Sequence, residues 1–279
     1  MTRITGSSAR PDWPLAVVVG AGGIGMAVAR RLGMSHRLLI ADLDQERLAR
    51  EVDALLAEGH DCVGYPCDIT DAASVEAFVE DVRRHGPMRV LAHVAAVSPS
   101  MADWQTILRI NLVGSASIER ALRPLAVQGT AAIFISSIAA YNARLDDALL
   151  ALLDQPITSG VIDQIGSAAG EGMDSAFAYG LSKAGVNRMC RRRAADWGSA
   201  GARIVSISPG LIASPMGALS YQTTPSKFAL LDQTPLDREG TMLEVAAAVA
   251  FLASDAASFI SGTDLIVDGG LTAARAFGA

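Results

Sequence analysis

The chain has 279 residues, of which 51% are hydrophobic and 19% are charged, so it can bury a sizeable core as one large α/β domain. Its net charge of -6 argues against a nucleic acid or an anionic membrane as a partner. Three cysteines without metal-ligand spacing predict reduced thiols and no metal site.

The N-terminal residues Met1–Asp12 are polar and lack the apolar core of a signal peptide. We therefore expect residues 1–13 to form a flexible tail before a single domain at 14–279. Gly, Asp or Arg interrupts the apolar stretches before about 18 residues, so no membrane-spanning helix is expected. Together with the reduced thiols, these features predict a cytoplasmic protein.

Strand and helix patterns alternate along the first half of the chain. Leu15–Gly20 is an apolar run typical of a buried strand, and the small residues of Gly23–Leu32 predict a helix. The further strands expected here are 37–41, 61–66, 90–95 and 131–136, and the further helices are 45–56, 72–84 and 111–127. The alternation predicts a single-domain Rossmann fold with a doubly wound parallel sheet of about seven strands.

The alternation breaks at residues 141–176, which are predicted to be a helical insertion with a helix at Asp146–Leu153 and a Gly/Ser-containing part at Gly160–Gly172. An apolar stripe at helical spacing comprises Leu145, Leu149, Leu152 and Leu153. We expect a second subunit to cover this stripe, which predicts a homodimer or homotetramer. The alternative is that the stripe packs against its own subunit.

The C-terminal part contains a helix around Tyr179, a strand at 203–207, a helix at 242–253 and a last strand at 264–267. Between them, residues 208–235 mix Pro, Gly, Ser and Thr with the apolar residues Leu211, Met216, Leu219, Tyr221 and Phe228. This composition predicts a mobile lid over a substrate.

A glycine-rich turn follows the first predicted strand. Gly20, Gly22 and Gly25 have the spacing G-x-G-x-x-G, and Gly23 and Ile24 complete the turn. Such glycines permit a tight turn, close approach of the backbone to a pyrophosphate, and close packing of helix on strand. An isolated match is usually only a flexible turn, but its place between a strand and a helix predicts a dinucleotide site.

Asp42 ends the second predicted strand, where a carboxylate can accept hydrogen bonds from both ribose hydroxyls of the adenosine half. A 2'-phosphate would be repelled there, so the chain is predicted to use NAD rather than NADP. Arg37 and Arg47 are the nearby basic residues that could weaken this preference. The alternative role for Asp42 is a helix N-cap or a surface acid.

Tyr179 and Lys183 lie four residues apart in a helical pattern, so both can face one site. A lysine cation favours the phenolate and brings the pKa of the tyrosine toward physiological pH, which suits acid/base chemistry on alcohols and ketones. The pair alone is a weak signal.

With these features the chain resembles the short-chain dehydrogenase/reductase family over about residues 14–272. The family's catalytic tetrad matches Asn111, Ser137, Tyr179 and Lys183. Its adenine contacts match Cys67, Asp68 and Ile69, with Leu43 and Ala95 lining the cofactor site; its nicotinamide segment matches Pro209, Gly210, Ile212 and Ser214; its C-terminal signature matches Asp268, Gly269 and Gly270.

The resemblance implies a role for each tetrad residue. Tyr179 exchanges a proton with the substrate oxygen, and Ser137 hydrogen-bonds that oxygen. Lys183 holds the nicotinamide ribose and favours ionisation of Tyr179. Asn111 supports a water that leads protons to solvent. Taken locally, Ser137 could instead merely end a strand and Asn111 could cap a helix.

The chain departs from the family pattern at three places. Only two residues separate Gly20 from Gly23, and Val19 replaces a threonine, so the phosphate turn is shorter than usual. His93 begins a His-Val-Ala-Ala run in place of Asn-Asn-Ala-Gly, and we interpret it as a structural residue. The segment between Ser137 and Tyr179 is longer than usual, as in bacterial 3α-hydroxysteroid dehydrogenase/carbonyl reductases.

The function expected from the sequence is hydride transfer between NAD(H) and a secondary alcohol or ketone, including alicyclic or hydroxysteroid-like substrates. An alternative is an NAD(H)-binding sensor or scaffold of the same fold with little turnover. A sugar-nucleotide epimerase is disfavoured because the chain has no sizeable C-terminal domain for the nucleotide sugar.

Overall fold

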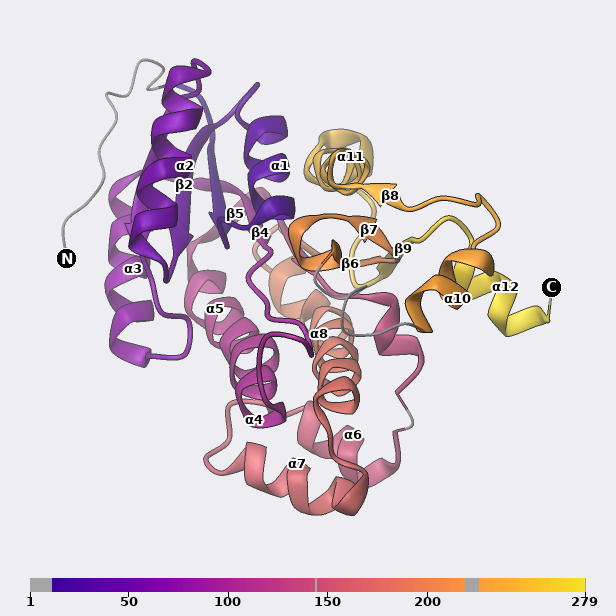
Figure 1. Ribbon diagram of the computed structural model, residues 1–279. Helices are drawn as coiled ribbons and strands as arrows, with labels where there is room; N and C mark the ends of the chain where they lie inside the picture. The colour runs from indigo at the N-terminus through magenta and orange to yellow at the C-terminus, as the bar shows by residue number, and fades with distance from the viewer. Residues whose placement is uncertain (1–11, 144, 219–225, 279) are drawn as a thin grey trace.

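A computed structural model describes residues 12–143, 145–218 and 226–278, and its centre is a sheet of seven parallel strands (Figure 1). The strand order is β3-β2-β1-β4-β5-β6-β9, so the direction of winding reverses between β1 and β4. The strands are β1 (Leu15–Val19), β2 (Arg37–Asp42), β3 (Cys62–Pro66), β4 (Met88–His93), β5 (Ala126–Ile135), β6 (Arg203–Pro209) and β9 (Asp264–Val267). The predicted doubly wound fold is confirmed.

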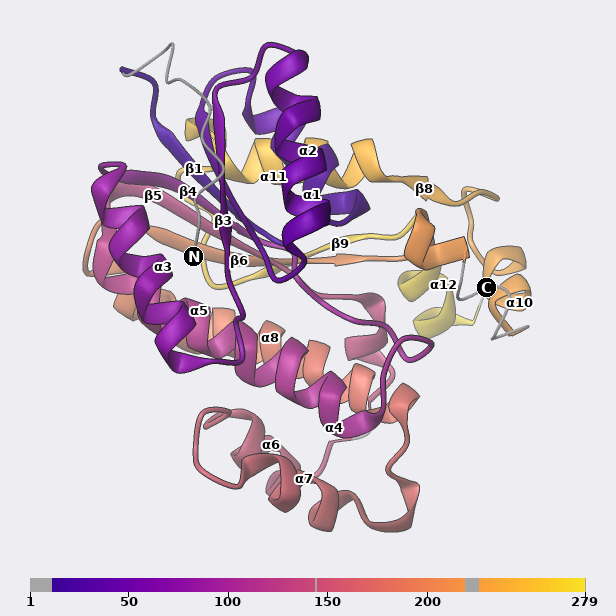
Figure 2. The ribbon, with the colours of Figure 1, turned by 60° about the vertical axis from the view of Figure 1, so that its left-hand side comes forward.

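Helices cover both faces of the sheet (Figures 1 and 2). One face carries α1 (Gly23–Leu32), α2 (Gln45–Ala57) and α11 (Met242–Ala253); the other carries α3 (Ala72–Arg84), α5 (Ser115–Leu122) and α8 (Ser175–Gly198). Because side chains alternate along a strand, Val18 packs in the first layer while Val17 and Val19 pack in the second. Both faces are therefore buried, which explains the continuous apolar run of β1.

The helix expected at 111–127 begins and ends earlier than predicted. Its first turn is α4 (Trp104–Ile107), where the Asp103 carboxylate accepts a hydrogen bond from the backbone N–H of Thr106 at 2.8 Å. A π-helical segment, Leu108–Gly114, then leads into α5, so Asn111 lies inside the helix and does not cap it.

β4 also ends two residues before the predicted boundary, because the chain turns away from the sheet. The backbone N–H groups of Val94 and Ala95 both donate to the carbonyl oxygen of Val19, each at 2.8 Å. This turn brings Ala95 next to Gly20 at the mouth of the sheet.

The insertion forms two helices, α6 (Asp147–Leu153) and α7 (Val161–Ala169), followed by a short 3-10 turn at Gly170–Gly172. They pack beneath α4 and α8 (Figure 2). Leu149 and Leu153 are only 4% and 1% exposed, in a cluster with Ile107, Leu181 and other residues of the same chain. The prediction that a second subunit covers the leucine stripe is therefore wrong in its premise, since the insertion has its own small core.

The segment 208–235 is more ordered at its start than expected. Ser208 and Pro209 belong to the buried strand β6, and β7 (Ile212–Ala213) pairs with β8 (Gly240–Thr241). The helix α10 (Ser226–Asp232) follows, whereas Leu219 and Tyr221 lie outside the described residues, as does the tail at 1–11. The chain closes with α12 (Leu271–Phe277). Within the part of the chain that the structure describes, none of the helices combines the length and apolarity needed to cross a membrane.

Candidate active site

A cleft with a volume of about 840 Å³ opens at the carboxyl ends of the strands, next to the reversal between β1 and β4. Ligands of open α/β sheets bind at this position. The predicted site residues that line it are Gly20, Gly22, Gly23, Ile24, Gly25, Asp42, Leu43, Cys67, Asp68, Ile69, Ala95, Ser137, Tyr179, Lys183, Pro209, Gly210, Ile212 and Ser214.

The geometry of the glycine turn fits a dinucleotide. Gly20 has a φ of +108°, and a Cβ at Gly25 would lie 1.8 Å from the Gly20 carbonyl oxygen, so both positions require glycine. Gly22 faces open space, where its backbone can approach a ligand. It is also the N-cap of α1 and offers no side chain to the first-turn N–H groups, which leaves them available to a pyrophosphate.

Asp42 is held against this turn at the end of β2. Its Oδ2 accepts a hydrogen bond from the N–H of Ala21 at 2.7 Å, and its Oδ1 accepts one from the N–H of Asp44 at 2.9 Å. Arg47 Nη2 lies 3.3 Å from the same Oδ1. Asp42 does not cap α2, because that role falls to Asp44.

The two arginines considered at the sequence level are placed differently. Arg47 lines the cleft beside Asp42. Arg37 donates to the carbonyl oxygens of Trp13 and His85, at 2.9 and 3.0 Å, near the opposite end of β2. Only Arg47 is therefore placed to influence cofactor choice.

Tyr179 and Ser137 meet at the other end of the cleft. Ser137 follows β5 and precedes a 3-10 turn, and Tyr179 lies in the first turns of α8. Burial raises the pKa of the Tyr179 phenol, and its hydrogen bond with Ser137 lowers it in part. The Lys183 ammonium donates to the Ile135 carbonyl and not to the phenol, so the expected lowering of the Tyr179 pKa by Lys183 is not found here.

Lys183 is buried one turn along α8 from Tyr179, with its Nζ 5.6 Å from the centroid of the tyrosine ring. Its ammonium donates to the carbonyl oxygen of Ile135 at 3.0 Å. Burial lowers the pKa of Lys183 to about 8. Ser136 supports the helix at this point by donating to the backbone carbonyl of Lys183 at 2.9 Å.

Asn111 is fully buried in the π-helical segment and does not line the cleft. Its amide makes two hydrogen bonds of 2.9 Å with the backbone of Val97, accepting from the N–H and donating to the carbonyl. It thereby fixes the chain after β4 to the helix that follows. The sequence gives no signal for this pairing, which depends on contacts across 14 residues.

His93 is buried at the end of β4, and its Nε2 is 2.9 Å from the hydroxyl of Ser115. Burial, with a smaller contribution from the charge of Lys183, lowers the pKa of His93 to about 3. The ring is therefore neutral at physiological pH, in agreement with a structural role.

The three cysteines are buried and unpaired with one another. Burial raises the pKa of both Cys62 and Cys67 to about 12, and that of Cys190 well above its usual range. Cys67 therefore lines the cleft as a neutral thiol. Among the described residues, no cluster of three or more His, Cys, Asp or Glu side chains could hold a metal ion.

Of the rest of the cleft wall, the sequence predicted Leu211 and Met216, as part of the lid. Near Ser137 and Tyr179 the wall is mainly apolar, and the residues there include Val97, Met101, Ile138, Phe177, Leu211, Met216 and Leu230. The polar groups at this end include Ser98 and Ser100, whose hydroxyls bond to each other at 2.9 Å. The other wall residues come from separate segments, including α8 for Phe177 and α10 for Leu230, and no local motif marks them.

Comparisons with known proteins agree with this geometry. A family model described as "Enoyl-(Acyl carrier protein) reductase" matches residues 19–152 and 147–272. The chain is 34% identical to D-threitol dehydrogenase of Mycolicibacterium smegmatis, over 94% of this chain and 94% of that protein. It is 31% identical to short-chain dehydrogenase/reductase bsc3 of Alternaria brassicicola, over 92% of this chain and 95% of that protein. Among solved structures, a short-chain type dehydrogenase/reductase from Mycobacterium ulcerans superposes with a TM-score of 0.77 at 26% identity, covering 93% of this chain and 90% of that one.

Proposed function

The chain belongs to the short-chain dehydrogenase/reductase family, and from this premise we propose that it is an NAD-dependent oxidoreductase acting on secondary alcohols and ketones. The observation that carries the proposal is the single cleft, which joins the glycine turn and Asp42 at one end to Ser137, Tyr179 and Lys183 at the other. A bound nicotinamide cofactor accepts or supplies the hydride.

The side chains of the site handle the proton and orient the substrate. Tyr179 exchanges a proton with the substrate oxygen, and Ser137 donates a hydrogen bond to that oxygen. Lys183 holds the nicotinamide ribose, and its cation favours the phenolate once it turns from the Ile135 carbonyl. Asn111 acts through Val97 by fixing the segment that borders the substrate.

The preference for NAD rests on Asp42. Its carboxylate is fixed by two backbone N–H groups, so it cannot easily turn away from a 2'-phosphate. Arg47 is the one lining cation beside it, and its charge is shared with Asp42 and Asp44. The relatives named above leave the choice between NAD and NADP open.

The proposed substrate is a bulky apolar alcohol or ketone, including alicyclic or hydroxysteroid-like compounds. The apolar wall around Ile138, Phe177 and Leu211 supports this, because it offers few partners for the hydroxyls of a polyol. We further propose that the part of the predicted lid that follows β6 covers the substrate, since Leu211, Met216 and Leu230 face the cleft.

We also propose a homodimer or homotetramer, now on grounds other than the leucine stripe. Leu243 and Phe251 lie two turns apart on α11 and are 67% and 45% exposed. Phe259, which follows α11 by six residues, is fully exposed, and β9 is an edge strand of the sheet. An apolar helix face beside an open sheet edge suits pairing with a second copy.

Absorbance of NADH tests the activity. We expect turnover of hydroxysteroids or cyclic alcohols and ketones, with kcat/KM for NAD at least about tenfold above that for NADP. Asp42→Ala should reduce the ratio of kcat/KM for NAD to that for NADP. The double variant Asp42→Ala, Arg47→Ala should reduce this ratio less, because it also lacks the arginine that could bind a 2'-phosphate. No turnover with any substrate, despite tight NADH binding, would favour the sensor or scaffold role instead.

A further inference from the structure

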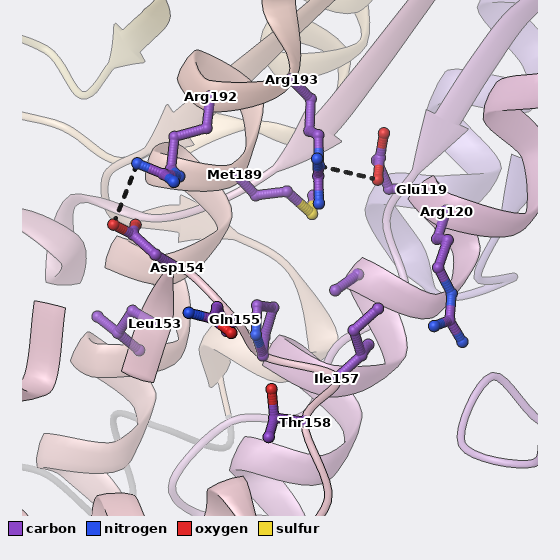
Figure 3. Close-up of a pocket in the computed structure, with 12 residues that line it drawn as sticks. Glu119, Arg120, Leu153, Asp154, Gln155, Ile157, Thr158, Met189, Arg192 and Arg193 are labelled. Carbon is purple, nitrogen blue, oxygen red and sulfur yellow. Dashed lines mark ion pairs between the residues drawn. The ribbon is translucent and has the colours of Figure 1, made fainter. Parts of the chain in front are cut away.

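A second pocket, with a volume of about 510 Å³, lies away from the proposed active site (Figure 3). It is bounded by α5, by the C-terminal half of α8 and by the turn that joins α6 to α7, at residues 154–158. It shares no lining residue with the cleft described above. Its volume falls within the range of small-molecule sites.

The pocket has more positive charge than its own carboxylates can neutralise. Arg192 contacts Asp154 at 3.3 Å, but Arg188 already holds both oxygens of that carboxylate, at 2.8 and 2.7 Å. Figure 3 shows this contact on one side of the pocket and Arg120 on the other. Among the described residues, the guanidinium of Arg120 has no hydrogen bond or ion pair.

The second carboxylate of the pocket, Glu119, is directed into the protein. It is 2% exposed and accepts a hydrogen bond from the indole N–H of Trp197 at 2.9 Å. Arg123 and Arg193 lie 3.6 and 3.7 Å from its oxygens. Arg123 and Arg193 therefore balance the charge of Glu119, and Glu119 makes no ion pair with Arg120. The guanidinium of Arg120 is left available to another anion.

Apolar side chains form the remaining wall. Leu153 and Met189 are 1% and 8% exposed, and Pro156 and Ile157 continue the surface in the turn between the insertion helices. The protein itself already buries most of this wall, and Ile157 is its partly exposed residue. A ligand with an apolar body would pack against Ile157 and the buried floor, which an ion such as inorganic phosphate would not do.

We propose that this pocket binds a small organic anion, a carboxylate on an aliphatic body, with Arg120 contacting the charge and Met189 and Ile157 contacting the body. The site is independent of the proposed reaction. It exists because the insertion closes the groove between α5 and α8.

Calorimetric titration of the full chain with n-octanoate, in the presence of saturating NADH, tests the proposal. We expect octanoate to bind and both acetate, which lacks the tail, and octanamide, which lacks the charge, to bind at least about tenfold more weakly. Failure of octanoate to bind at millimolar concentration would overturn the proposal.

Two variants locate the binding. Arg120→Ala should weaken octanoate binding about tenfold, and Thr158→Glu, which adds a carboxylate to the pocket, should weaken it similarly. Arg50→Ala on α2 is the matched control, because it removes an exposed arginine far from the pocket and should leave the affinity within about twofold. An affinity that Arg120→Ala and Thr158→Glu leave unchanged would place octanoate elsewhere and overturn the proposal.

Discussion

Proton transfer by Tyr179 depends on one atom, its phenolic oxygen. Tyr179→Phe should lower kcat by about 10²–10⁴-fold, because it removes the transferable proton and a contact to the substrate oxygen. The affinity for NADH, measured by fluorescence titration, should stay within about twofold. Tyr65→Phe is the control, since Tyr65 packs on Phe78 outside the cleft. Retention of more than a tenth of the original kcat by Tyr179→Phe would contradict the assignment.

Burial of Lys183 makes a stability contribution that depends on pH. The pKa of Lys183 falls from 10.5 to about 8 on folding. Below pH 8 the buried ammonium therefore lowers the free energy of unfolding. As pH rises through the folded pKa toward the unfolded one, this cost disappears and wild-type stability should increase relative to a variant that does not titrate. Denaturant unfolding should show this gain over Lys183→Met as about 2–3 kcal/mol between pH 7 and pH 10. A pH-independent difference would show that the ammonium is well solvated.

At the same scale, the sequence predicted the cofactor end of the site better than the substrate end. The glycine turn and Asp42 act through local geometry, so their spacing identifies them. The bond between Asn111 and Val97, by contrast, exists only after β4 and the π-helical segment come together. The apolar wall near Tyr179 is assembled from several helices and loops, and each contributes side chains that are common in any core.

Among the elements, the insertion is the one whose observed packing differs from the prediction, because its leucines pack within the same chain. Leu153→Ala should lower the free energy of unfolding by about 2–5 kcal/mol, because it opens a cavity in the small core beneath α4 and α8. Leu152→Ala is the matched control, and it should cost less because Leu152 is only partly buried. Urea unfolding of both variants measures the difference. Equal costs would contradict the burial seen in the structure.

Helices with strong local signals were predicted with the right bounds. α3 and α11 begin where capping side chains stand, Asp71 for α3 and Thr241 with Glu244 for α11. The start of α4 was missed although Asp103 is a capping residue, because the π-helical segment disturbs the period of its apolar side chains. Three residues of the leucine stripe lie on α6 as expected, whereas Leu145 precedes the helix, and sequence alone could not show which surface covers the stripe.

For the whole molecule, the exposed face of α11 predicts self-association. Light scattering should find a dimer or tetramer, and the double variant Leu243→Glu, Phe251→Glu should shift it toward monomer, since both side chains are exposed in the single chain. Because both side chains are exposed, the double variant should keep its fold, which circular dichroism would check. Met34→Glu, an exposed apolar residue after α1, is the control and should leave the oligomer intact. A monomeric wild-type protein would contradict the proposed homo-oligomer.

The position of β1 at the centre of the sheet has a consequence for the newly made chain. β1 pairs on one edge with β2, which is synthesised soon after it. Its other edge pairs with β4, which is synthesised later. At roughly 5–20 residues per second, the ribosome leaves that edge open for several seconds. During this interval the unpaired backbone groups of β1 can pair with a neighbouring nascent chain. The yield of native protein in a cell should therefore depend on translation speed and chaperone access between β2 and β4 as well as on the stability of the finished fold.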